Sequence, residues 1–336
     1  MFELISADFV SHTSPIPASY PLKPSSHNAK SLCCLRATGQ QGGSVISYVL
    51  NDPELSKEYT IRAITRDPTS SSASALAKLP IEVVKADIND SDSLFTALKG
   101  AHTVFAMTAP TFGPHAKAIE FGQGKAMADA AVQEGVCYLI FSTLPSVTKV
   151  SGGKYTNVYG FDAKADVEEY IRTVPIKSAF FAPGSFMQNF QGIIAPTPDG
   201  KGGYVIARHV SAMSQLPLID IVGDTGKYVG AILAEPEKYE GRTFCAATAL
   251  YSMEEIAQII SKASGMKVVY QETSVKEFKK HLPPWADMLI EMMLYQEEFG
   301  YYGPESKQLV AWAVENARGR VNTFEEYLMQ NPLSLH

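Results

Sequence analysis

The sequence predicts an α/β fold built on a doubly wound parallel sheet, with a smaller α+β lobe on the substrate side at its C-terminal end. Apolar strand-like segments alternate with helix-like segments from about residue 31 to residue 183. A glycine-containing turn joins the first of these strands to the first helix. Beyond residue 183 the alternation ends, and a Pro- and Gly-rich passage leads to shorter elements.

Six short apolar runs are the expected strands of the large sheet. They cover residues 31–35, 60–65, 82–86, 103–107, 137–142 and 176–182. Each run is bounded by turn residues, and helices are expected in the intervals. This order predicts parallel strands with helices on both faces of the sheet.

Glycines mark the ends of two expected helices. Gly100 and Gly135 each follow a helical pattern, and glycine readily adopts the left-handed conformation that closes helices. The second of these helices spans 114–134 and contains Gly122 and Gly124. Both lower the intrinsic helix propensity, and they are expected to allow close packing instead.

Three segments of unequal character follow one another along the chain. Residues 1–29 are rich in Ser and Pro and are expected to be a disordered extension. Residues 30–183 form the expected dinucleotide-binding domain, to which later segments return, and 184–330 form the smaller lobe. Capping-box spacings place helix starts at 252–255, 274–277 and 323–326.

Composition excludes several classes of function. Of the 336 residues 46% are hydrophobic, which is enough for a sizeable core, and the net charge of −6 comes without a basic cluster. Direct nucleic-acid binding is therefore disfavoured. The four cysteines and seven histidines show no ligand spacing, so we expect no metal site and a reducing compartment. No apolar run is long enough to span a membrane and no secretory signal is evident, which favours the cytoplasm, with the nucleus as an alternative.

The glycine turn between the first strand and the first helix carries the strongest functional signal. In the run 36–43, Arg-Ala-Thr-Gly-Gln-Gln-Gly-Gly, the spacing resembles the G-x-x-G-x-x-G pattern that lets a backbone approach a pyrophosphate at a helix N-terminus. Gly39 and Gly42 stand where the pattern places glycine, whereas Arg36 replaces the first glycine. We predict a bound dinucleotide, and we expect Arg36 to weaken its binding.

The residue after the second strand indicates which dinucleotide is preferred. Arg66 lies where such folds contact the adenosine ribose, and an arginine there can pair with a 2′-phosphate. This favours NADP over NAD, with NAD kept as the alternative. The other interpretation is a solvated surface arginine, since the neighbouring Asp67 would repel a phosphate.

The next two strand ends are expected to line the same crevice. Asp87 ends the third strand beside the adenine, and residues 108–110 end the fourth beside the middle of the cofactor. Carboxyl ends of strands in an open parallel sheet form the ligand crevice. Alternatively, Asp87 forms a turn or caps the helix ahead of Asp90.

A set of catalytic residues is present only in part. Ser142 ends the fifth strand, and Lys164 lies near the start of the following helix. In short-chain dehydrogenases a Tyr four residues before the Lys moves the proton that accompanies hydride transfer. That position is Gly160 here, and Tyr159 points about 100° away on a regular helix. Lys164 could hold a ribose hydroxyl, or it could be an exposed lysine paired with Glu168.

Together these segments resemble the NmrA-like family, a group of atypical short-chain dehydrogenases. The likeness runs from about residue 30 to 328. It rests on the segments 37–43, 65–68, 161–170, 183–190, 216–220 and 224–229. The resemblance implies an NAD(P)-binding Rossmann fold in which many members lack the catalytic tyrosine. Members include redox-sensing transcriptional co-regulators and reductases of fungal specialised-metabolite pathways.

The resemblance also implies a role for each matching residue. The pyrophosphate is assigned to Thr38, Gly39, Gln40, Gln41, Gly42 and Gly43, and the 2′-phosphate end to Arg66, Asp67, Pro68, Thr69 and Ser70. Asp87 and Ile88 flank the adenine. The ribose and nicotinamide are assigned to Thr108, Ala109, Pro110, Lys164, Phe186, Met187, Gln188 and Asn189. For Phe186 and Met187, core packing is the alternative.

Three functions remain open at this stage. The favoured one is a dinucleotide or redox sensor that a protein partner, such as a transcription factor, reads; it is supported by Gly160. The second is an NADPH-dependent reductase that uses another proton donor, such as Tyr155, Tyr159, His115 or water. The third is an interaction module without dinucleotide affinity, which Arg36 supports. Whether the protein is an enzyme is therefore left open.

Overall fold

The computed structural model describes residues 29–111, 113–192, 194–280 and 287–335. The extension that we expected to be disordered therefore lies outside the described residues, except for its last position. All elements below belong to the described part of the chain.

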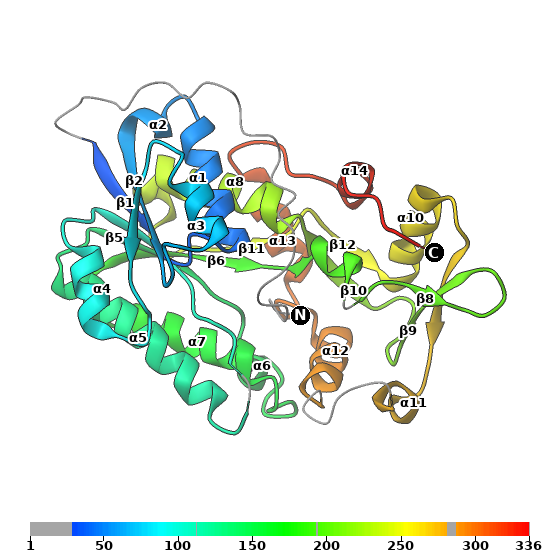
Figure 1. Ribbon diagram of the computed structural model, residues 1–336. Coiled ribbons are helices and arrows are strands. Elements are labelled where there is room, and N and C mark those ends of the chain that lie inside the picture. Colours follow the sequence, from blue (N-terminus) through cyan, green and yellow to red (C-terminus); the bar gives the residue numbers. More distant parts are fainter. Residues whose placement is uncertain (1–28, 112, 193, 281–286, 336) are drawn as a thin grey trace.

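A seven-stranded parallel sheet forms the centre of the larger half (Figure 1). Its strand order is β11-β6-β5-β4-β1-β2-β3. The strands are β1 (Lys30–Cys34), β2 (Tyr59–Thr65), β3 (Glu82–Lys85), β4 (Thr103–Ala106), β5 (Tyr138–Ser142), β6 (Lys177–Pro183) and β11 (Thr243–Ala246). This confirms the predicted doubly wound sheet, and each of the six expected strands is found within about one residue at either end. The order reverses between β1 and β4, which is the switch point where such sheets bind ligands.

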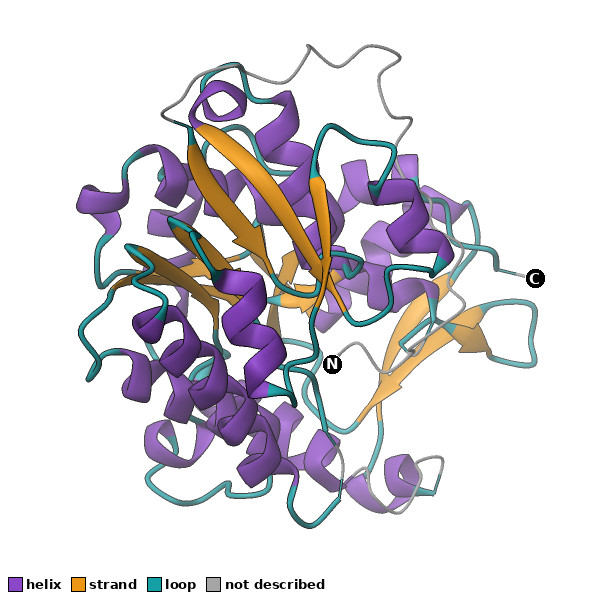
Figure 2. Ribbon diagram, turned by 60° about the vertical axis from the view of Figure 1, so that its left-hand side comes forward, coloured by secondary structure: helices purple, strands orange, loops and turns teal. Residues whose placement is uncertain are grey.

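Helices cover both faces of this sheet (Figures 1 and 2). One layer consists of α1 (Gln40–Asn51), α8 (Ile221–Ala234) and α13 (Ser306–Glu315). The other consists of α4 (Ser91–Leu98), α5 (Ala116–Gln133) and α7 (Tyr159–Ile171). Buried apolar side chains of each layer pack against those of the sheet. The spacing of apolar residues along the sequence therefore changes from that of a strand to that of a helix and back.

Three of the four glycines noted in the second helical layer act as expected, and Gly122 does not. Gly100 and Gly135 adopt φ values of 72° and 70° at the ends of α4 and α5. Within α5, a Cβ on Gly124 would lie 2.3 Å from a methyl of Val167 on α7, so glycine is what allows the two helices to touch. Gly122, in contrast, is exposed and faces open space.

The smaller lobe contains two three-stranded sheets with its own core (Figure 1). The strands are β7 (Ser185–Phe186), β10 (Gln215–Ile219) and β12 (Ala249–Ser252) in one sheet, and β8 (Thr197–Pro198), β9 (Tyr204–Arg208) and β13 (Val268–Glu272) in the other. Its helices are α10 (Met253–Ser264), α11 (Val275–Lys279), α12 (Asp287–Phe299) and α14 (Phe324–Gln330). Ser252 and Thr323 form full capping boxes with Glu255 and Glu326, and the Ser274 hydroxyl accepts from the N–H of Glu277.

Segments from the second half of the chain complete the first half. β11 pairs in parallel with β6, and α8 packs against α1. The remaining short helices are α2 (Leu55–Glu58), α3 (Ser71–Leu76), α6 (Val147–Val150), α9 (Pro236–Tyr239) and the 3-10 helix η1 (Met187–Gln191). The larger half therefore depends on residues that come after the smaller lobe has begun.

Candidate functional site

The turn between β1 and α1 has the tight geometry that its glycines predict. Gly39 is the N-cap residue of α1, and a Cβ on Gly42 would lie 2.7 Å from the carbonyl oxygen of Arg36. Arg36 itself has a φ of 52°, in the left-handed region that glycine adopts most easily. The turn thus keeps a glycine-like backbone at position 36 although the residue is an arginine.

The N-terminus of α1 is arranged to attract an anion. No side chain caps this helix, and its first turn holds no acidic residue. The buried Oε1 of Gln41 also has no hydrogen-bond partner among the described residues, but an amide oxygen is an acceptor and so suits a hydroxyl donor, not the anion itself. Uncapped N–H groups at a helix start, with the positive end of the helix dipole, favour a phosphate or carboxylate.

The Arg36 side chain crosses from this turn to the next strand end. Its Nη1 donates to the carbonyl oxygen of Thr108 at 3.0 Å. Thr108 follows β4, so the guanidinium connects the two strand ends at the switch point of the sheet. A ligand bound across this edge would meet the Arg36 side chain.

A buried ion pair lies directly behind this connection. Lys164 on α7 pairs with the Oε1 of Glu120 on α5, and its Nζ also donates to the Thr108 hydroxyl at 2.8 Å. The Thr108 hydroxyl in turn donates to Glu120 at 2.6 Å. The side chains of Lys164 and Glu120 are only 10% and 2% exposed. We call these three residues the Lys164 cluster.

The Lys164 cluster differs from the exposed pairing that the helix spacing allowed. Glu168, one turn further along α7, pairs with Arg172 at 2.7 Å instead. Removing two charges from water costs several kcal/mol for each ion, and only a close pair with further hydrogen bonds offsets that cost. Buried charges of this kind gather at functional sites more often than on plain scaffold surfaces.

Two members of this edge were missed from the sequence. Glu120 and Gln123 lie on the buried side of α5 together with Ala116, Gly124 and Met127. Gln123 accepts from the N–H of Ala109 at 3.2 Å and donates to Asn89 at 3.1 Å, which ties the loop after β4 to the loop after β3. The available signal was a carboxylate and an amide on an otherwise small and apolar helix face.

The loops after β2 and β3 form the other end of the crevice. Arg66 is exposed, as are Asp67, Pro68 and Thr69. The Asp67 carboxylate accepts from the hydroxyl and the N–H of Thr69, and these hydrogen bonds lower its pKa. Ser70 caps α3 through the N–H of Ala73.

Asp87 forms a turn after β3. Its Oδ1 accepts from the N–H of Asn89 at 2.9 Å and from the Asn89 amide at 3.0 Å. Asp90, not Asp87, is the N-cap residue of α4. Ile88 is buried in the core beneath α4 and α5. The turn interpretation of Asp87 matches this arrangement, which leaves its second carboxylate oxygen available to a ligand.

The other candidate acids lie away from the Lys164 cluster. Ser142 is the buried last residue of β5, and the hydroxyl of the next residue, Thr143, donates to the carbonyl of Lys164 at 3.3 Å. The Tyr155 hydroxyl donates to Glu298 on α12 at 3.0 Å. Burial and this hydrogen bond raise the pKa of Tyr155, whereas a proton-transferring tyrosine needs a lowered pKa.

Two further acids named from the sequence lie at helix starts. Tyr159, the first residue of α7, packs against the core of the smaller lobe. His115 is exposed at the N-cap position of α5. The side chains that contact the Lys164 ammonium group are instead Thr108 and Glu120.

The segment 186–189 has mixed surroundings. Met187 is fully buried in the core of the smaller lobe, and Phe186 packs in part against the core of the larger half. Gln188 donates to Asp220 at 2.6 Å and accepts from the N–H of Ile221, at the start of α8. Asn189 begins a turn whose carbonyl accepts from the N–H of Ile194. Core packing therefore describes Met187 well.

Sequence comparison identifies the family to which this arrangement belongs. Residues 28–328 match the model of the NmrA-like family. The chain belongs to the NmrA-like family. The match covers all segments on which the resemblance rested, including the turn around Gly39 and the helix around Lys164.

Curated NmrA-like relatives cover most of this chain. One is the NmrA-like family domain-containing oxidoreductase FrzB of Cladobotryum sp, 29% identical over 81% of this chain and 86% of that protein. Another is the NmrA-like family domain-containing oxidoreductase ptmS of Penicillium ochrochloron, 29% identical over 74% of this chain and 75% of that protein.

Solved structures share the fold at lower identity. NmrA, a negative transcriptional regulator crystallised with NAD, has a TM-score of 0.75 at 21% identity, covering 90% of this chain and 95% of that one. The triphenylmethane reductase of Citrobacter sp., crystallised with NADP(H), has a TM-score of 0.71 at 21% identity, covering 90% of this chain and all of that one. These similarities show that this NmrA-like chain has a Rossmann-like fold.

No described helix is both long enough and apolar enough to cross a membrane. The described residues also contain no group of three or more His, Cys, Asp or Glu side chains placed to hold a metal ion.

Proposed function

We propose that this NmrA-like protein binds NADP(H) and acts as an oxidoreductase. The observation that carries the proposal is the Lys164 cluster, a buried lysine–carboxylate pair placed at the carboxyl end of β4 and next to the anion-attracting start of α1. A scaffold without a ligand gains little from so costly a pair. Relatives such as FrzB and ptmS carry the name oxidoreductase, and two structural neighbours were crystallised with NADP(H) or NADPH.

The start of α1 is the proposed binding site of the diphosphate. The uncapped N–H groups after Gly39 are donors that fit phosphate oxygens, and the Gln41 oxygen is an acceptor that fits a ribose hydroxyl. Arg66, exposed after β2, is the proposed partner of a 2′-phosphate, which favours NADP over NAD. Residues 30–183 with β11 and α8 form the proposed dinucleotide-binding unit, and 184–330 otherwise form the substrate-side lobe.

In this proposal the protein's main contribution to the reaction is to position the cofactor, and acid–base catalysis by its side chains is minor. A reduced nicotinamide supplies a hydride when it is bound. Lys164 is the proposed donor to a ribose hydroxyl, and Glu120 and Thr108 fix the position of its ammonium group. Because Gly160 replaces the usual tyrosine, water is the proposed source of the proton that the product takes up with the hydride.

A dinucleotide-sensing regulator is the second candidate function. The glycine at position 160 favours it, since a sensor needs no proton donor. NmrA, which has the same fold, is a negative transcriptional regulator. In this candidate function the protein binds NADP(H) without turnover and a protein partner reads the bound state.

Two measurements test and separate these functions. Titration of NADPH fluorescence with the purified protein should show saturable binding, and its absence at millimolar NADPH would reject both. Oxidation of NADPH, followed at 340 nm with ketones, enals and quinones, should occur if the protein is an oxidoreductase. Tight binding without any turnover across that panel would favour the sensor.

A matched pair of lysine variants tests the proposed contact. Lys164→Met should weaken NADPH binding roughly tenfold or more, because it removes a charged hydrogen bond to the ribose. Lys117→Met is the control, since Lys117 also joins α5 to α7, through Asp166 at 2.9 Å, but it is 46% exposed. Equal affinities in both variants would contradict the role of Lys164.

A further inference from the structure

A small cavity inside the smaller lobe has an unusual mixture of walls. Most of its lining is apolar, from Phe190, Ile194, Ile206, Leu216, Met253, Ile256, Met292 and Met293. Four polar side chains interrupt this lining: Ser185, Arg208, Gln296 and Tyr301. A few polar groups converging in an apolar cavity are typical of a small-molecule site.

Two of the polar side chains have no hydrogen-bond partner within the described part of the chain. Ser185 and Gln296 are only 5% and 6% exposed, and no described hydrogen bond uses the hydroxyl or the carboxamide. Neither is sealed in the interior like the Nδ1 of His209, which is a buried atom without a partner. Both residues line the cavity, which is where a partner for these polar atoms can bind. A buried amide or hydroxyl without a partner costs about 1–3 kcal/mol, so a ligand or water that satisfies both is favoured.

Arg208 brings a positive charge to the same cavity. Its Nη1 and Nη2 donate to the carbonyl oxygens of Ala207 and Ile194, at 2.7 Å and 3.5 Å, and its guanidinium lies 5.8 Å from the ring centroid of Phe278. No described carboxylate forms an ion pair with it. Arg208 is half-buried, and burial lowers its pKa. A guanidinium has five N–H donors, so several remain for an anion.

The lobe's secondary structure explains why these groups meet. Ile206 and Arg208 are two residues apart on β9 and so lie on one face of the strand. Met292, Met293 and Gln296 share one face of α12, at a helical spacing of three to four residues. Tyr301 closes the end nearest the large sheet, where its hydroxyl donates to the carbonyl of Pro183 on β6 at 3.2 Å.

We propose that this cavity binds the carboxylate of a small apolar acid, with Arg208 as its counter-ion and Gln296 and Ser185 as hydrogen-bond donors. The polar groups offer mainly donors, which matches a carboxylate and not a cation. The apolar walls match a short hydrocarbon or aromatic body and exclude a fully hydrated ion. The cavity encloses about 30 Å³, room for roughly two waters, so the ligand enters by displacing flexible methionine side chains.

Calorimetric and thermal titrations at pH 7.5 test this proposal, with hexanoate and benzoate as probes. Their alcohols, hexan-1-ol and benzyl alcohol, and inorganic phosphate serve as comparisons. Both acids should raise Tm with dose and bind at least tenfold more tightly than the alcohols or phosphate, because only they join a charge to an apolar body. Equal shifts with acid and alcohol, or no binding of either acid, would overturn the proposal and leave ordered water as the occupant.

Variants of the polar lining make the test specific. Arg208→Met should reduce the affinity for both acids roughly 10- to 100-fold, since it removes the counter-ion. The same variant should raise Tm of the ligand-free protein by about 2 °C, because it removes a half-buried charge. Gln296→Leu should weaken both acids several-fold. Arg242→Met, which removes an exposed arginine lying over Trp312, is the matched control and should change neither quantity.

Two further measurements keep the outcome interpretable. Arg208→Lys keeps the charge and should retain part of the binding, so a loss in Arg208→Met cannot be assigned to misfolding. NADPH titration of Arg208→Met should give the affinity of the unaltered protein, because the cavity does not involve the start of α1. The proposed carboxylate site can therefore be rejected without rejecting the proposed dinucleotide site, and the dinucleotide site can be rejected without rejecting the carboxylate site. Unchanged hexanoate binding in Arg208→Met would contradict the proposal.

Discussion

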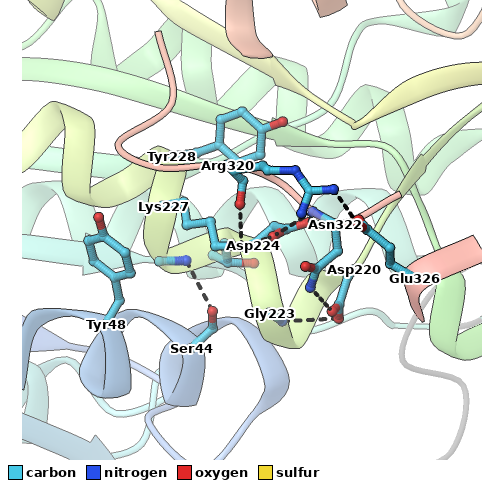
Figure 3. Close-up of polar contacts among 12 residues, drawn as sticks. Ser44, Tyr48, Asp220, Gly223, Asp224, Lys227, Tyr228, Arg320, Asn322 and Glu326 are labelled. Atoms are coloured by element: carbon cyan, nitrogen blue, oxygen red, sulfur yellow. Dashed lines mark hydrogen bonds and ion pairs between the residues drawn. The ribbon is translucent and has the colours of Figure 1, made fainter. Parts of the chain in front are cut away.

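Two lysine–carboxylate pairs in this protein, each with a buried carboxylate, are surrounded in different ways. Lys164 and Glu120 lie at the carboxyl edge of the large sheet, beside the loops that follow β1 and β4. Lys227 and Asp224 lie on α8, with a distance of 2.7 Å between Nζ and Oδ1. Figure 3 shows the second pair and the residues around it.

The second pair is held mainly by protein groups from distant parts of the chain. Asp224 also accepts from the N–H of Asn322, and Lys227 donates to the carbonyl of Arg320 at 2.7 Å (Figure 3). The Asn322 amide donates to Asp220 at 2.8 Å, so the segment before α14 is fastened to the start of α8. This pair binds one chain segment to another. The Lys164 cluster instead lies at the edge where ligands of parallel sheets bind, so it is position, and not burial alone, that distinguishes the two pairs.

Replacing each lysine by methionine gives the largest expected effects and tests this comparison directly. Lys164→Met and Lys227→Met each leave a buried carboxylate unpaired and should each lower the free energy of unfolding by about 3–5 kcal/mol. Only Lys164→Met should also reduce NADPH binding and turnover. Urea unfolding and NADPH titration of both variants measure this. If Lys227→Met lost cofactor affinity as severely, the division between the two pairs would be wrong.

The pH dependence of stability should come from the second pair. Burial raises the pKa of Asp224 from 3.8 to about 6, so the folded state binds a proton that the unfolded state has released. The stability that protonation of Asp224 provides is complete below about pH 4 and is lost as the pH rises through 6. Between pH 4 and pH 7 the free energy of unfolding of the protein should fall by up to about 3 kcal/mol more than that of the Asp224→Asn variant, which has no carboxyl group to titrate at this position. Urea unfolding at four pH values checks this, and a constant difference between the two proteins would contradict it.

Close packing between α1 and α8 should be sensitive to a single methyl group. A Cβ on Gly226 would lie 2.3 Å from the Cβ of Tyr48, and the Gly226 N–H donates to the Ser44 hydroxyl (Figure 3). Gly226→Ala should therefore destabilise the protein by about 1–3 kcal/mol. The control is Gly122→Ala on α5, where open space surrounds the new methyl and stability should rise by up to about 1 kcal/mol. Thermal unfolding of both variants distinguishes packing from helix propensity.

Substitution of Arg36 gives the smallest expected effect, a change in NADPH affinity, and tests whether its side chain obstructs the carboxyl edge of the sheet. Arg36→Gly removes a side chain that a bound diphosphate must displace from Thr108, and it should tighten NADPH binding about tenfold, equivalent to about 1.4 kcal/mol. Arg36→Ala removes the same side chain but keeps the left-handed strain at position 36. Both should therefore bind more tightly, with Gly also the more stable. Weaker binding in both would mean that the guanidinium contacts the phosphates.

The sheet and its helices were predictable because their signals are local. Glycine at positions 100 and 135 and the alternating apolar runs specify turns, strands and helices within a few residues. The family resemblance likewise followed from short segments such as the one around Gly39, and the family match confirms it. The left-handed backbone of Arg36 agrees with the glycine that the pattern expects there.

The partners within the site were not predictable, because they join distant parts of the chain. Besides the ribose contact, the sequence offered only Glu168 as a partner of Lys164, and within the chain it pairs with Glu120, 44 positions away. The hydrogen bond between Gln188 and Asp220, 32 positions apart, was likewise not predicted. Helical spacing describes neighbours on one helix, whereas the buried partner depends on how two helices pack.

The position of β11 in the sheet also affects how the chain is made. During synthesis β6 leaves the ribosome before β11, so one edge of β6 has no strand to pair with. That edge remains unpaired until residues Thr243–Ala246 have been synthesised and have docked as β11. An unpaired strand edge is a template for association with other chains. Mutations that slow folding of the smaller lobe should therefore cause aggregation through the nucleotide-binding half, even when they lie far from its surface.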